Sequence, residues 1–252
     1  MQGKLIIYQP WLAGLLPEGL PYPSSTLISG HGGSGKPLIG FAFVYNWLKA
    51  GGNVIFIPLQ YPEMKLVKTS LKRLYDLDIE EYSGKVGYIR LNPDLETWRK
   101  IGMNTLEANL LKPDVWDAAI NEGEGLLTSV GDLGTMLVAS ALNLLLFSPT
   151  YKKLNIDKFE SLLSCDKRRT YLFSVSTDVF REDIEKWERV ADNLMFARME
   201  KPMKLYLKVS RIGSKEVSSK EAQVPIEKEI LEEIKEIAES ARKREIPKLA
   251  KI

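Results

Sequence analysis

The chain has 252 residues, of which 44% are hydrophobic and 27% charged, and its formal net charge is +2. Length and composition fit one large α/β domain or two small ones, and so weak a charge does not favour nucleic-acid binding, which usually needs a strongly basic surface. A single cysteine and a single histidine exclude an intramolecular disulfide, a Cys/His metal site and a histidine-based catalytic triad.

The sequence does not predict a membrane protein. Its longest uncharged apolar stretch, residues 133–147, is shorter than the roughly 20 residues that a spanning helix needs, so we expect a buried helix there. Residues 1–10 lack the charged start and long apolar centre of a cleavable signal, which predicts a cytoplasmic protein. Lysine and glutamate are plentiful and glutamine is scarce, a bias typical of hyperthermophile proteins.

The first predicted unit is a strand, a glycine-rich loop, a helix and a second strand. Residues 25–29 form an apolar run with β-branched members, as does the second strand at residues 53–57. Between them, residues 38–50 can form a helix, which Gly51 and Gly52 end. This is the context that a phosphate-binding loop requires.

The loop itself consists of Gly30, His31, Gly32, Gly33, Ser34, Gly35, Lys36 and Pro37. It fits the template G-x-x-x-x-G-K-[ST] up to the last position, so we predict an ATP- or ADP-binding loop rather than a merely flexible turn. In that template backbone N–H groups hold phosphates, the lysine contacts the terminal phosphates and the final hydroxyl binds Mg²⁺. Pro37 lacks both the hydroxyl and the N–H. We expect the helix to begin at Pro37, with Lys36 displaced and the site empty or weakly occupied, and we interpret His31 as a variable loop position.

Helices and strands continue to alternate beyond this unit. The predicted helices span residues 63–75, 94–112, 133–147, 156–163 and 181–191, and the predicted strands span residues 86–91, 126–130 and 170–176. Residues 112–125 are predicted to be a loop or an irregular helix. This alternation predicts a mostly parallel sheet with helices on both faces. Ligands bind such sheets at the carboxyl ends of the strands, where the loop, Gln60, Asp132 and Ser176 would lie.

The last part of the chain follows a different pattern. Residues 194–198 and 203–209 predict a hairpin that turns at Lys201 and Pro202 and gives the sheet an antiparallel edge. The apolar residues Ile226, Ile230, Ile234, Ile237 and Ala241 then recur at helical spacing in a charged stretch. We therefore divide the chain into a domain of residues 1–225 and a C-terminal amphipathic helix and tail of residues 226–252, whose apolar stripe packs on that domain or on a partner.

Together these segments resemble the KaiC-like branch of the RecA-type ATPases, which is common in archaea. The resemblance rests on Leu-Leu-Pro-Glu-Gly at residues 15–19, on residues 26–30 with the loop, and on residues 53–62, and it weakens towards Asp132. It implies a RecA-like core that assembles into homo-oligomeric rings or filaments, with ATP or ADP and Mg²⁺ at subunit junctions. The family also implies protein or peptide partners, which bind by strand addition or in a groove.

The chain departs from this family where the chemistry occurs. The family's second strand ends in acidic residues, one of which acts on the attacking water, but this chain has Gln60 and Tyr61 there. A glutamine can orient water but cannot accept its proton. Asp132 matches the acidic residue that holds magnesium through water, although it could equally be a helix N-cap. Lys208 and Arg211 lie near the family's subunit-bridging basic residues, with two exposed strand-end charges as the alternative.

Three hypotheses follow from these departures. The first is a RecA/KaiC-like protein with a degenerate nucleotide site, which acts as a regulatory or protein-binding module with little or no ATP hydrolysis, because losses in one phosphoryl-transfer reaction should compound. The second is an active but atypical Mg-ATP-dependent ATPase in which Gln60 orients water and Asp132 helps to hold the metal. The third is a recombinase-like single-stranded DNA binder, which rests on fold analogy alone.

Overall fold

The computed structural model describes residues 3–60, 64–128, 131, 133–217 and 221–252, without the side chains of residues 234, 238, 241 and 242. The strands are β1 (Gly3–Leu5), β2 (Leu20–Tyr22), β3 (Ser25–Gly30), β4 (Asn53–Pro58), β5 (Val86–Leu91), β6 (Trp98–Gly102), β7 (Thr105–Ala108), β8 (Thr135–Ser140), β9 (Thr170–Ser176), β10 (Asn193–Glu200), β11 (Lys204–Ile212), β12 (Lys215–Glu216) and β13 (Glu221–Gln223). The α-helices are α1 (Pro10–Leu15), α2 (Lys36–Lys49), α3 (Met64–Tyr75), α4 (Pro113–Gly125), α5 (Lys152–Cys165), α6 (Arg181–Val190) and α7 (Lys228–Leu249), and the 3₁₀ helices are η1 (Ile79–Lys85) and η2 (Leu142–Phe147).

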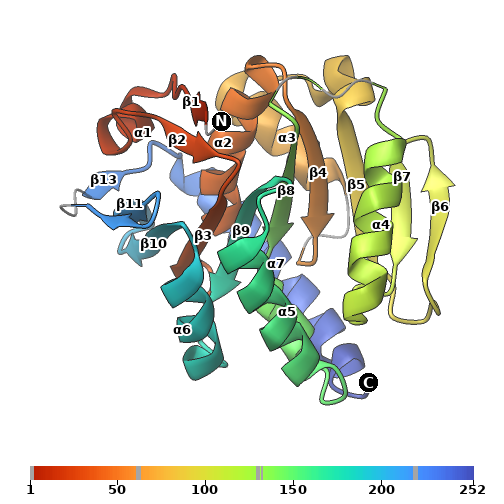
Figure 1. The fold of residues 1–252 in the computed structure, drawn as a ribbon. Helices are drawn as coiled ribbons and strands as arrows, with labels where there is room; N and C mark the ends of the chain where they lie inside the picture. Colours follow the sequence, from red (N-terminus) through yellow and green to blue (C-terminus); the bar gives the residue numbers. More distant parts are fainter. Residues whose placement is uncertain (1–2, 61–63, 129–130, 132, 218–220) are drawn as a thin grey trace.

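The strands form one large twisted sheet, with β1 and β2 paired beside it (Figure 1). Its order is β12-β11-β10-β3-β9-β8-β4-β5-β7-β6, and β13 pairs with β11. Neighbouring strands from β10 to β7 in this order are parallel, whereas β11 and β6 run antiparallel at the two edges. The predicted parallel α/β sheet with a C-terminal antiparallel edge is therefore confirmed, and a second antiparallel edge is added at β6.

Each face of the sheet is covered by its own layer of helices, as Figure 1 shows for α4, α5 and α6 in front of the strands. Side chains alternate between the two layers: Val54 and Phe56 of β4 join the core beneath α2 and α3, while Ile55 and Ile57 join the core beneath α4, α5 and α6. A strand buried on both sides needs apolar residues at every position, which explains the uninterrupted apolar sequence of β4. Among the described helices, none has the length and hydropathy needed to cross a bilayer.

Most of the predicted elements are present within a few residues of their predicted bounds. The strands β3, β4, β5 and β9, the helices α2, α3, α5 and α6, and the β10–β11 hairpin agree with the sequence, although residues 61–63 lie outside the described part of the chain. Helix α2 begins at Lys36 with Gly35 as its N-cap, not at Pro37. Gly35 takes the left-handed turn before the helix, so Lys36 follows it directly into the first turn and Pro37 occupies an N-terminal position where its missing N–H costs little.

The predicted helix at residues 94–112 is wrong, because β6 and β7 form an antiparallel hairpin there. In β7, Leu106 and Ala108 are buried while Thr105 and Glu107 are half-buried, which is the two-residue period of a strand. The outermost strand β6 is largely exposed, so its sequence shows no such alternation.

Residues 112–125 are also more ordered than the sequence suggested. They form the regular helix α4, which begins at Pro113, and the loop alternative is wrong. Its buried residues Val115, Trp116, Ala119, Ile120 and Gly123 recur at helical spacing against the sheet. The acidic residues and glycines that suggested a loop lie mainly on the other side of this helix.

The largest correction concerns the fourth central strand. It was predicted at residues 126–130, followed by a helix at residues 133–147, but the strand is β8 at Thr135–Ser140 and the 3₁₀ helix η2 follows it. The uncharged run is thus a strand buried on both faces, and periodicity alone does not distinguish such a strand from a buried helix. Residues 129–130 and 132 lie outside the described part of the chain.

The C-terminal helix α7 starts at Lys228, two residues after the predicted first apolar position. Near its start, Ile230 and Leu231 are buried in the core of α2 and α3, and near its end Leu249 is buried in the core on the opposite face. The helix therefore passes from one layer to the other, and its apolar residues pack on its own domain at both ends. Ile237 in the middle is 36% exposed, whereas the side chains of Ile234 and Ala241 are outside the description.

Candidate nucleotide-binding site

The glycine-rich loop joins β3 to α2 at the carboxyl edge of the sheet, as the sequence predicted. A Cβ at Gly30 would lie 2.1 Å from the carbonyl oxygen of Ala197 on the neighbouring strand β10, so only glycine fits there. Gly35 has a φ of 60°, the left-handed conformation that glycine adopts without strain. These two positions give the loop its tight course between the strand and the helix.

Lys36 folds back onto the loop. Its Nζ donates hydrogen bonds to the carbonyl oxygens of Gly30 and His31 at 2.8 and 2.5 Å and to Ser34 Oγ at 2.9 Å. Ser34 Oγ in turn donates to the carbonyl oxygen of His31 at 2.7 Å. The lysine is only 6% exposed, so a phosphate that recruits this ammonium group must replace these internal contacts.

A carboxylate also lies against the loop. Asp178 follows β9, and its Oδ2 accepts a hydrogen bond from the Gly32 N–H at 2.9 Å and from Ser176 Oγ at 3.1 Å. Its Oδ1 lies 3.0 Å from Nδ1 of His31. Burial raises the pKa of Asp178, but the hydrogen bonds from His31, Gly32 and Ser176 outweigh it and lower the pKa below the ordinary value, so the carboxylate is ionised at neutral pH.

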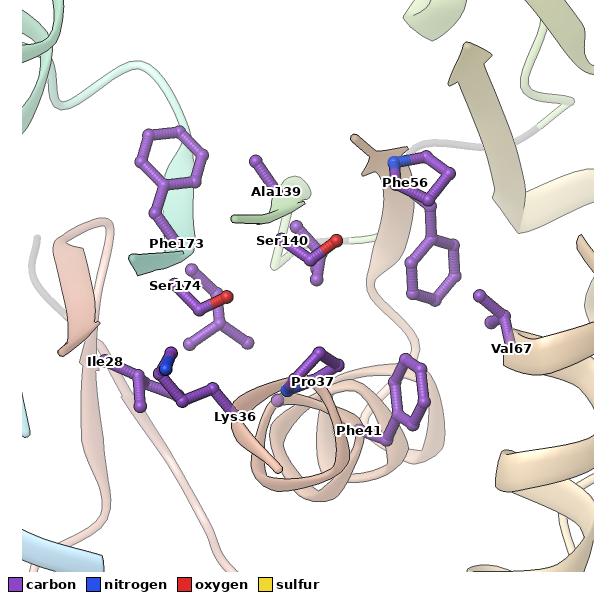
Figure 2. A pocket seen from close by; sticks show the side chains of 14 residues that line it. Ile28, Lys36, Pro37, Phe41, Phe56, Val67, Ala139, Ser140, Phe173 and Ser174 are labelled. Atoms are coloured by element: carbon purple, nitrogen blue, oxygen red, sulfur yellow. The ribbon is translucent and has the colours of Figure 1, made fainter. Parts of the chain in front are cut away.

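A small cavity of about 30 Å³ lies beside the loop, where α2 starts and β4, β8 and β9 end. Figure 2 shows Pro37 and Phe41 on one side of this space and Ser140 on the other, with Phe56 and Val67 at one end. Lys36 is the one charged side chain among the described residues that line it. Ligand pockets are usually about 300–1,000 Å³, so the space has room for water-sized groups and not for a nucleoside triphosphate.

The side chains around this cavity do not fit a magnesium ion. Mg²⁺ prefers an octahedron of oxygen ligands that includes one or two carboxylates. The described lining offers the hydroxyls of Ser140 and Ser174 instead, and Ser140 Oγ is buried without a hydrogen-bond partner in the part of the chain that the structure describes. Nor do the described residues bring three or more His, Cys, Asp or Glu side chains together as a metal site.

The next two predicted site residues are Gln60, expected to be catalytic, and Asp132, expected to help hold the metal. Gln60 lies two residues beyond the end of β4 and is half-buried, but it does not line the cavity. Asp132 lies outside the described residues. The argument that placed it at the end of a strand no longer holds, because β8 ends at Ser140, which pairs with Pro58 at the carboxyl end of β4. At the carboxyl end of this strand the structure has Ser140.

The two predicted subunit-bridging residues differ in their surroundings. Lys208 is exposed on β11 and pairs in register with Glu221 of β13. Arg211 instead donates hydrogen bonds to the carbonyl oxygens of Ala191, at 3.0 and 2.8 Å, and of Glu188. These are the last carbonyl groups of α6, so Arg211 caps that helix and stabilises its negative end.

Helix α7 lies next to the loop, which the sequence did not indicate. A Cβ built on Gly35 would lie 3.2 Å from Leu231 Cδ2, and one on Gly33 would lie 3.9 Å from Lys235 Cγ. Farther along, α7 contacts η2, which follows β8. The helix therefore extends along the carboxyl edge of the sheet from the loop towards β8.

Three features of the site were missed in the sequence. Ser140 was hidden because its strand was assigned to a helix, whereas Asp178 had a usable signal, since it lies two residues beyond Ser176 at the predicted ligand-binding edge. The contact of Leu231 with the loop had no signal, because an amphipathic pattern does not show which surface the helix covers.

Comparison with known proteins agrees with this fold. The family model described as "ATPase: KaiC" matches residues 9–110. No curated protein matches the chain. Among solved structures, the fold is similar to that of the KaiC-like protein PH0186 from the hyperthermophilic archaeon Pyrococcus horikoshii OT3, with a TM-score of 0.63 and 15% identity over 90% of this chain and 97% of that chain. At that identity the likeness to the solved structure concerns the fold alone, and the match to the KaiC ATPase model covers the part of the chain that contains the glycine-rich loop.

Proposed function

We propose that the nucleotide site of this chain is degenerate and that the protein acts as a regulatory or protein-binding module with little or no ATP hydrolysis. The observation that carries the proposal is the lining of the cavity beside the phosphate loop. Where β4 and β8 end, the residues are Pro58 and Ser140, and α2 contributes Pro37 and Phe41. Phosphoryl transfer depends almost wholly on positioned charge, and this lining has a single cation and no described carboxylate.

The losses affect separate parts of one phosphoryl-transfer reaction, so their effects on its rate multiply. Pro37 supplies neither the metal-binding hydroxyl nor an N–H, and Ser140 replaces a carboxylate that would hold magnesium through water. Gln60 can hydrogen-bond to water but cannot accept its proton. ATP or ADP would bind weakly, since Lys36 must also exchange its contacts with the loop.

A protein with this fold can still bind other proteins when it does not hydrolyse ATP. The outermost strand β6 leaves one edge of the sheet available for strand addition. Ile101 in this strand is 42% exposed, and Met103 directly after it is 83% exposed. We propose that this edge binds an extended segment of a protein partner, or of a second copy in a homo-oligomer. Light scattering on the purified protein, compared with Met103→Glu, tests the oligomer.

Phosphate release from Mg-ATP tests the degenerate site directly. The wild type should release phosphate no faster than Lys36→Ala, because the lysine has no reaction to support. Lys49→Ala is the matched control, since Lys49 lies at the exposed end of the same helix. A wild-type rate of about 1 s⁻¹ or more, lost in Lys36→Ala and kept in Lys49→Ala, would refute the proposal and support an atypical ATPase.

A further inference from the structure

Asp178 accepts a hydrogen bond from a backbone N–H group of the glycine-rich loop. The loop begins where β3 ends, and Gly30 pairs in register with Ser176 at the end of β9. Thr177 also donates its backbone N–H to the carbonyl oxygen of Gly30 at 3.1 Å. The chain that carries Asp178 is thus fixed beside the loop, and its carboxylate reaches the Gly32 N–H at 2.9 Å.

The contacts of this carboxylate are of the kind that an anion makes with a phosphate-binding loop. Phosphate loops recognise anions through backbone N–H groups, and carboxylates and phosphates share the negative charge and the acceptor oxygens that such groups bind. Here the anion receives one loop N–H, one hydroxyl from Ser176 and a contact from the ring of His31. The loop therefore already has an anionic partner within its own chain.

We propose that Asp178 is an internal substitute for a nucleotide phosphate, and that it is the specificity-determining residue that excludes diphosphate groups from the loop. This inference rests on the proposed degenerate site and identifies the residue that closes it. An incoming phosphate must take the Gly32 N–H from Asp178, yet the carboxylate stays tethered at the end of β9. Two anions would then share one small site, which is unfavourable because like charges repel strongly where water is partly excluded.

Removing the charge should open the loop to diphosphate. We would measure binding of inorganic pyrophosphate and of ADP by calorimetry for the wild type, Asp178→Asn and Asp178→Ala. Asp178→Asn removes the charge and keeps the shape, and Asp178→Ala removes both. Glu182→Gln is the matched control, because it loses one exposed carboxylate four residues later in α6. Thermal unfolding of each variant establishes that it is folded.

We expect both Asp178 variants to bind pyrophosphate and ADP at least about tenfold more tightly than the wild type and Glu182→Gln, a change of about 1.4 kcal/mol. If either variant is folded and binds pyrophosphate no more tightly, the inference is overturned. A gain for ADP without a gain for pyrophosphate also overturns it, since recognition would then come from the base and sugar. Wild-type hydrolysis of ATP would instead refute the proposed function, so the two failures are distinguishable.

Discussion

Replacement of Leu231 by alanine tests whether α7 is docked on the phosphate loop. Leu231 is 2% exposed, and a Cβ on Gly35 would lie 3.2 Å from its Cδ2. Leu→Ala changes in cores cost roughly 2–5 kcal/mol, and because the first turns of a helix can relax into the space, we expect the lower end, about 2 kcal/mol. For a chain of this length, each kcal/mol lowers the unfolding temperature by about 2–4 °C, so Leu231→Ala should lower it by roughly 4–8 °C.

The matched control is Ile237→Ala on the same helix, where the side chain is 36% exposed and the expected cost is below about 0.5 kcal/mol. Calorimetry gives the unfolding temperature, and hydrogen exchange reports the loop itself. Exchange of the amides at residues 32–36 should accelerate in Leu231→Ala and stay unchanged in Ile237→Ala. Equal unfolding temperatures and equal loop exchange in the two variants would show that α7 does not support the loop.

Three further predictions address the site and the core. The pKa of Asp178 is lowered because its hydrogen bonds outweigh burial, so the ionised carboxylate stabilises the fold above the ordinary carboxyl pKa. This stability is lost as the pH falls through the lowered pKa. At pH 7 the wild type should therefore unfold at a higher temperature than Asp178→Asn, and the two unfolding temperatures should begin to converge below about pH 4 and meet at lower pH. In the Asp178→Asn background, Pro37→Thr alone should leave the thermal shift caused by ADP independent of Mg²⁺. Pro37→Thr together with Ser140→Asp should make that shift larger with Mg²⁺, because only the pair restores both kinds of metal ligand. A Mg²⁺-dependent shift with Pro37→Thr alone would contradict this. Trp187→Phe should lower the free energy of unfolding, measured with denaturant, by about 1 kcal/mol more than Trp116→Phe does. The indole N–H of Trp187 donates to a backbone carbonyl at 3.1 Å, whereas that of Trp116 is buried without a partner among the described residues. Equal losses would show that the hydrogen bond contributes nothing.

The sequence predicted the strands well where an apolar run and its flanking turn residues indicated the same bounds. The strands at residues 86–91 and 170–176 were bounded correctly because each is a short β-branched or aromatic run between turn residues. The strand β8 was missed because a fully buried parallel strand and a buried helix share the same uncharged pattern, and only the pairing with β4 and β9 distinguishes them. The strand β6 was missed because one exposed edge strand has no apolar face to reveal it.

The site was predictable in its composition but not in its contacts. The loop and Pro37 were readable directly, since the template specifies residue types at fixed spacing. The position of Ser140 depended on the assignment of one strand, because β8 ends at Ser140 and not at residue 130, where the sequence placed the strand end. The contact between Asp178 and the Gly32 N–H depends on how Gly30 turns the chain and on the register of β3 against β9, and both are properties of the assembled sheet.

The course of α7 limits how quickly anything can reach the phosphate loop from that side. Its first turns are anchored in one core by Ile230 and Leu231, and its last turn is anchored in the other core by Leu249. Leu231 would lie 3.2 Å from a Cβ on Gly35, so a ligand that approaches Gly35 past this helix requires the first anchored end to detach. Along this path, the rate of local unfolding of the helix end limits how fast a ligand enters and leaves, and diffusion does not. The packing of a few leucine and isoleucine side chains sets that unfolding rate.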